Sequence, residues 1–146
     1  MNIDKLNRAT THQAGVVCNS VLKRAKGKTP KIKDYPAMIV ACGLKQHSKD
    51  YSVETSRSCQ NYKYEDVILR ELEKLGKIDG RSNIKNCDNR VGHCAEPHAA
   101  NELARRHNSV KIEDFEFGVA IRPRTLQPKS YCENCKHTFP QLNKHK

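Results

Sequence analysis

The chain is poor in aromatic residues and has no long apolar run. Its 146 residues include no tryptophan, and aromatic residues make up 5% of the total. The longest apolar run lies at 37–41, far short of the roughly 20 residues that a transmembrane helix requires. The first residues form no apolar segment, so we expect neither a signal peptide nor a membrane partner. The composition therefore predicts one domain with a modest core.

Acidic residues are scarce relative to basic ones. The chain has 27 lysines and arginines against 16 acidic residues, which gives a net charge of +11. The basic residues are concentrated at 23–33 and at 122–129. Because contacts between basic side chains and phosphates release counterions, this excess favours a nucleic acid as the partner. The alternative is that both clusters are ordinary solvated loops.

Hydrophobic periodicity predicts an α/β organisation in a single domain, 1–146. We expect an N-terminal helix and a basic linker at 1–35, a core at 36–140 and a frayed polar tail at 141–146. The core begins with a β-hairpin, because two apolar or alternating segments flank a short polar connection. The elements expected in the core are strands at 37–45, 51–57 and 115–124, and helices at 65–75, 95–107 and 132–139.

Two short segments carry candidate metal ligands. Cys132 and Cys135 form a C-x-x-C pair, a spacing that lets two thiolates reach one tetrahedral zinc ion. Alone, this pair also fits a zinc knuckle or a redox dithiol. Cys94 is the candidate third ligand, and Glu96 follows it at the start of the 95–107 helix. Three protein ligands leave the fourth position for water, which is the arrangement of catalytic zinc sites.

Other residues compete for the same metal ion. Cys87 could complete a closed four-cysteine site, and the protein would then be a basic nucleic-acid-binding module without catalytic activity. His93 could replace Cys94, but its spacing to Glu96 would then be three residues rather than two. The remaining cysteines are expected to pack as small hydrophobic side chains: Cys18, Cys42 and Cys59.

The segments CAEPHAAN at 94–101 and CENC at 132–135 together resemble the zinc-dependent cytidine deaminase-like superfamily, in particular its toxin-type, YwqJ-like members. The usual signature of the superfamily is H-x-E followed by P-C-x-x-C. Here Cys94 stands in place of the histidine and Tyr131 in place of the proline. The resemblance covers about 36–140. It implies a cytidine deaminase-like α/β fold, with a small mixed sheet, a helix-strand-helix unit that carries the zinc, an extra N-terminal helix and a shortened C-terminus.

The resemblance also implies an activity. The chain would be a hydrolase in which Cys94, Cys132 and Cys135 hold Zn²⁺ and Glu96 transfers protons. It would deaminate a nucleobase, with cytosine in single-stranded DNA preferred and with double strands, RNA or adenine as alternatives. The residues expected to contact the substrate are Tyr131, His98, Asn101, Arg122, Arg124 and Lys129.

The same resemblance suggests partners and a place of action. DNA is favoured over RNA as the macromolecular partner, and a toxin-type member would be a monomer with a cognate immunity protein. The place of action stays open between the interior of the cell and delivery as a toxin domain.

Overall fold

A computed structural model describes residues 3–144 of the chain. These residues form a mixture of helices and strands, as the periodicity predicts. The helices are α1 (Ile3–Arg24), α2 (Asp66–Glu73), α3 (Ala95–Arg106) and α4 (Glu133–Thr138), with 3-10 turns η1 (Ile32–Asp34), η2 (Ile112–Asp114) and η3 (Pro140–Lys144). The strands are β1 (Ile39–Leu44), β2 (His47–Thr55), β3 (Phe115–Phe117), β4 (Ala120–Arg122) and β5 (Gln127–Lys129). None of the described helices is long and apolar enough to cross a membrane.

The five strands form one sheet in the order β2-β1-β4-β5, and β3 also pairs with β1. Every pairing between the described strands is antiparallel, so the expectation of a mixed sheet is wrong. Strands β3 and β4 lie one after the other along β1, opposite Cys42 and Ile39. Strand β5 was not expected from the sequence, because Pro128 and the basic residues around it are typical of a loop.

The strand expected at 115–124 is broken where α1 packs against it. A Cβ atom at Gly118 would lie 2.9 Å from Asn7 Oδ1 and 3.0 Å from the carbonyl carbon of Leu6, so only glycine allows this close approach. Asn7 Oδ1 in turn accepts a hydrogen bond of 2.6 Å from the backbone N–H of Val119. Helix α1 therefore supplies the acceptor for a backbone N–H group that, in a continuous strand, would bond to the neighbouring strand.

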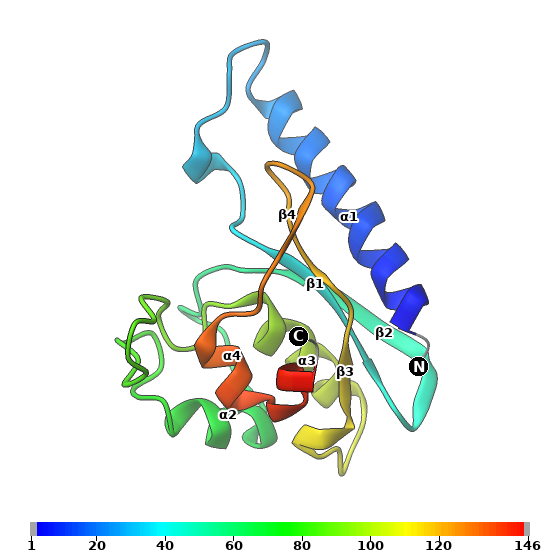
Figure 1. Cartoon of the computed structure of the whole chain (residues 1–146), viewed down its shortest axis with the longest axis vertical. Helices are drawn as coiled ribbons and strands as arrows, with labels where there is room; N and C mark the ends of the chain where they lie inside the picture. The colour runs from blue at the N-terminus through cyan, green and yellow to red at the C-terminus, as the bar shows by residue number, and fades with distance from the viewer. Residues whose placement is uncertain (1–2, 145–146) are drawn as a thin grey trace.

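Helices cover both faces of the sheet, as Figure 1 shows, with α1 on one face and α2, α3 and α4 on the other. All six residues of β1 are buried. Val40, Cys42 and Leu44 belong to the main core beneath α2–α4, whereas Ile39 packs with Ala14 of α1. This alternation follows from the two-residue period of a strand, and it explains why β1 is apolar throughout.

The chain end is packed rather than frayed as far as it is described. The side-chain amide of Gln141 donates hydrogen bonds to the carbonyl oxygens of Ile112 and Phe115, at 2.8 and 2.9 Å. Leu142 is 1% exposed and belongs to the main core. The expectation of a frayed tail is therefore wrong for these two positions, and 145–146 lie outside the described residues.

Candidate metal centre

Three cysteines from two distant segments meet at one end of the main core. The sulfur atoms of Cys94, Cys132 and Cys135 all lie within 4.8 Å of one another. Cys94 is the N-cap residue of α3 and Cys132 that of α4, so both sulfurs lie at helix N-termini. Cys135 is in the first turn of α4 and is buried. The predicted ligands therefore come together in three dimensions, and the cluster could hold a metal ion.

The thiols of the cluster influence one another's protonation. Hydrogen bonds from Cys135 and Cys94 lower the pKa of Cys132. The hydrogen bond between Cys94 and Cys132 raises the pKa of Cys94. Burial raises the pKa of Cys135. The cluster thus holds one thiolate readily, while the other two sulfurs keep their protons. A divalent cation would displace these protons, because ligation deprotonates a thiol outright. Three sulfur donors favour zinc over Mg²⁺ or Ca²⁺.

Glu96 lies beside the cluster in an unusual environment for a carboxylate. Its side chain is 0% exposed, and neither carboxylate oxygen forms a full hydrogen bond among the described residues. Interactions with its own backbone N–H and with the Cys135 thiol only partly offset the effect of burial. Burial, together with the nearby charge of Cys132, raises the pKa of Glu96 to about 7. A buried polar group without a partner costs free energy that folding does not recover. This arrangement therefore fits a carboxylate kept for a ligand, a metal-bound group or a proton transfer.

A cavity of about 460 Å³ opens onto this centre. Cys94, Cys132 and Glu96 form part of its wall. On the remaining sides it is bordered by aromatic, basic and amide side chains, among them Tyr35, Arg57, Asn89, Arg90 and Lys129. The volume lies in the range of small-molecule binding sites.

A second, basic cavity of about 450 Å³ shares part of its lining with the first. Tyr35 and Lys129 border both cavities. Lys33, Arg122 and Arg124 line only the second cavity. Lys33 from the first basic cluster of the sequence thus meets residues of the second cluster here, because the β4–β5 hairpin runs beside the segment between α1 and β1 (Figure 1).

Three of the residues expected to contact a substrate lie elsewhere. Tyr131 lines a different cavity, and its hydroxyl donates a hydrogen bond to the carbonyl oxygen of Gly118. His98 is fully buried, with Nε2 at 3.2 Å from the carbonyl oxygen of Arg57. Burial lowers the pKa of His98 to about 4, so the ring is neutral at physiological pH.

Asn101 is the third of these residues, and its side chain forms hydrogen bonds within the fold. Its Oδ1 accepts a hydrogen bond of 2.6 Å from the backbone N–H of Glu65, the N-cap residue of α2. Its Nδ2 donates to the carbonyl oxygen of Lys63 and to the hydroxyl of Tyr62. Asn101 therefore connects α3 to the start of α2.

The residues that competed for the metal do not join the three-cysteine cluster. Cys87 is absent from the set of sulfurs that lie within 4.8 Å of one another, which argues against a closed four-cysteine site. His93 instead interacts through Nε2 with the carboxylate of Asp79 at 2.5 Å. The cluster thus offers three candidate ligands, and two of them, Cys94 and Cys132, border the cavity.

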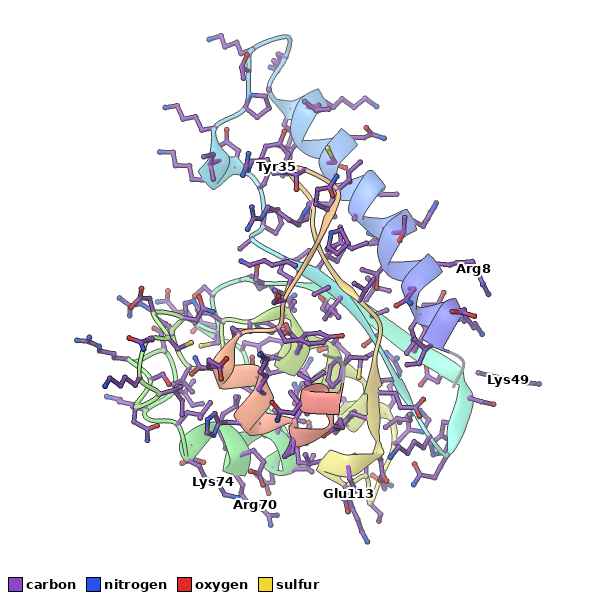
Figure 2. All side chains as sticks on the ribbon, in the orientation of Figure 1. Arg8, Tyr35, Lys49, Arg70, Lys74 and Glu113 are labelled. Atoms are coloured by element: carbon purple, nitrogen blue, oxygen red, sulfur yellow. The ribbon has the colours of Figure 1, made fainter. Side chains whose placement is uncertain are left out.

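The sequence did not indicate Tyr35, Arg57 or Asn89 as residues of the site. Tyr35, labelled in Figure 2, lies in the linker before β1. Arg57 is the last residue of the strand expected at 51–57 but follows the end of β2, and Asn89 lies in a loop without periodic pattern. Only the basic cluster at 23–33 hinted that the linker takes part. No protein-family model, curated protein or solved structure matches the chain.

Proposed function

We propose that the protein is a zinc-dependent hydrolase of the cytidine deaminase-like fold that deaminates a nucleobase, cytosine in single-stranded DNA. The observation that carries the proposal is the partnerless, fully buried carboxylate of Glu96 beside three converging cysteines. A purely structural three-thiol site does not require such a carboxylate. A hydrolytic site needs one, because protons must move between water and the leaving group.

The residues have separate tasks in this reaction. Cys94, Cys132 and Cys135 would hold the zinc ion, which would supply Lewis-acid activation of a water molecule. A carboxylate oxygen of Glu96 accepts the proton that the water loses. The same carboxyl would donate this first proton to the ring nitrogen. It would then carry a second proton, from the hydroxyl added to the ring carbon, to the amino group, which leaves as ammonia.

The surroundings of the site favour a polymeric substrate. A base must leave its stack to enter a cavity of about 460 Å³, so an unpaired base is the easier substrate. The side chain of Tyr35 borders the cavity and offers an aromatic face for stacking. The adjoining basic cavity, with Lys33, Arg122 and Arg124, offers positive charge for the flanking phosphates. A free nucleoside carries no flanking phosphates and would not need this second cavity.

The test is to incubate the protein with single-stranded DNA, double-stranded DNA and RNA and to sequence the products. We expect cytosine to be read as thymine in single-stranded DNA. Glu96→Gln should abolish this change while zinc content stays the same, because Glu96 is not a ligand. Adenine read as guanine, or changes in RNA alone, would move the substrate to one of the alternatives. No change in any substrate with the three-cysteine cluster loaded would overturn the proposal.

A further inference from the structure

A second group of potential ligands lies close to the three-cysteine cluster but is separate from it. One ligand atom each from Cys59, Asp79 and His93 lies within 4.8 Å of the other two. Cys59 is in the segment after β2, Asp79 is in the segment after α2, and His93 directly precedes Cys94. A thiol, a carboxylate and an imidazole are the three side-chain types that bind zinc in proteins.

Backbone hydrogen bonds hold the segments that carry these residues together. The N–H of Asp79 donates to the carbonyl oxygen of Val91 at 2.9 Å, and the N–H of Arg57 donates to that of His93 at 2.9 Å. Asp79 has a φ of 68°, in the left-handed region where aspartate, like asparagine, is more common than most residues other than glycine. The segment 74–94 contains no α-helix or strand, so these contacts define its course.

The chain passes unusually close to the sulfur of Cys59. A Cβ atom at Gly92 would lie 3.2 Å from Cys59 Sγ and 3.2 Å from a ring carbon of Tyr64, and Gly92 has a φ of 89°. Only glycine therefore fits between these side chains. The hydroxyl of Tyr64 donates a hydrogen bond of 2.6 Å to the carbonyl oxygen of Gly92 and fixes this turn. The loop is thus closed around the sulfur, one residue before His93.

The three residues could also be read as a cysteine nucleophile with a histidine base and an orienting carboxylate. Two observations argue against a nucleophile. Cys59 is 4% exposed and does not line the cavity, so a substrate cannot reach it. Burial, reinforced by the charge of Asp79, raises the pKa of Cys59, whereas a nucleophilic cysteine needs a lowered pKa.

We propose that Cys59, Asp79 and His93 form a second zinc site, which fastens the loop 74–94 to the end of β2. The fourth ligand would be water, because the side chains of Asp79 and His93 are 47% and 27% exposed. Zinc ligands lie roughly 3.4 Å apart in a tetrahedral site, given metal–ligand distances near 2.1 Å. The 2.5 Å contact between His93 and Asp79 must therefore open when the ion enters. This proposal does not depend on the deaminase activity.

Zinc bound per chain, measured by equilibrium dialysis against a series of buffered zinc concentrations, tests the second site. We expect the wild type to saturate at two ions. Asp79→Asn and His93→Asn should each saturate at one, since each removes a ligand and leaves the three cysteines intact. Asp66→Asn, which removes an exposed carboxylate from the first turn of α2, is the matched control and should still saturate at two. An Asp79→Asn protein that binds as many ions as the wild type would overturn the proposal.

Cys132→Ser separates the two sites, because it removes a ligand of the cluster and none of the second group. This variant should retain one zinc ion, and the ring nitrogen signals of His93 should shift when zinc is added. If the three-cysteine cluster fails to bind zinc, the wild type should saturate at one ion and Asp79→Asn at none. Failure of the cluster is thereby distinguished from failure of the second site. Unshifted His93 signals at saturating zinc would also count against the proposal.

Discussion

The sulfur atoms of Cys94 and Cys132 lie 3.3 Å apart although 38 positions separate them in the sequence. Each residue caps the N-terminus of a helix, and strands β3, β4 and β5 carry the chain from the end of α3 to the start of α4. Because the N-terminus of a helix favours negative charge, the geometry suits thiolate ligands. The contact thus depends on the tertiary fold and not on the C-x-x-C spacing alone.

Removal of Cys132 should abolish zinc binding by the cluster, whereas removal of Cys87 should leave it unchanged. Cys87→Ser keeps all three sulfurs that lie within 4.8 Å of one another, and Cys132→Ser leaves two. Zinc per chain, measured after gel filtration, distinguishes the variants. A Cys87→Ser protein that loses the same ion as Cys132→Ser would restore the closed four-cysteine site.

Alanine substitution of the basic residues that line the second cavity should weaken nucleic-acid binding mainly at low salt. Arg122, Arg124 and Lys129 line that cavity. Each phosphate contact that is lost should reduce the slope of log K against log salt by about 1. Fluorescence anisotropy with labelled single-stranded DNA over a range of KCl concentrations gives this slope for each alanine variant.

Arg70→Ala is the matched control for these variants. Arg70 is exposed on α2, at the end of the molecule away from Tyr35 (Figure 2). Its loss should leave the slope unchanged, although it removes the same charge. Equal effects of Arg70→Ala and Arg124→Ala would show that net charge alone governs binding.

Asn101→Ala should destabilise the fold. The substitution leaves the backbone N–H of Glu65 at the start of α2 without its acceptor and removes two further hydrogen bonds. The loss of these buried hydrogen bonds at the start of α2 should lower the free energy of unfolding by about 2–3 kcal/mol. Urea unfolding should show a lower midpoint with an unchanged m value. Asn108→Ala, at an exposed position just after α3, should stay within about 0.5 kcal/mol of the wild type.

His98 should make a contribution to stability that falls on mild acidification. The raised pKa of Glu96 contributes with the opposite sign, because between pH 4.5 and about 7 the folded chain binds a proton there that the unfolded chain does not. Burial, together with the charge of Arg57, lowers the pKa of His98 from 6.5 to about 4. Between these pH values the unfolded chain binds a proton at His98 that the folded chain does not, so this contribution to the free energy of unfolding decreases as the pH falls. The loss is at most about 3 kcal/mol at the lower end of this window.

Urea unfolding at a series of pH values down to about 4 measures the effect of His98. The free energy of unfolding of His98→Gln, taken relative to the wild type at each pH, should rise as the pH falls across the window. His12→Gln, at an exposed position of α1, should follow the wild type at every pH. Acid also releases metal from thiolates, but this contribution is common to all three proteins. Identical pH profiles for His98→Gln and the wild type would contradict the prediction.

The local pattern of the sequence was sufficient for most helices and strands. Strand β1 and helix α3, which begins at Ala95, lie close to their expected bounds. These elements depend on periodicity within short segments, which the sequence displays directly. The pairing of Cys94 with the C-x-x-C pair was expected instead from the resemblance to the deaminase signature, because no local pattern connects residues 38 positions apart.

The tertiary structure decided the remaining features, because they depend on contacts between residues far apart in the chain. The break at Gly118 arises from the approach of α1, and Asn101 is withdrawn from the cavity by the start of α2. Tyr35 reaches the cavity only because the linker turns back beside β5. The complete burial of Glu96 without a partner, on which the proposed chemistry rests, likewise results from packing around α3. Burial and desolvation are properties of the assembled core, and no short segment carries them.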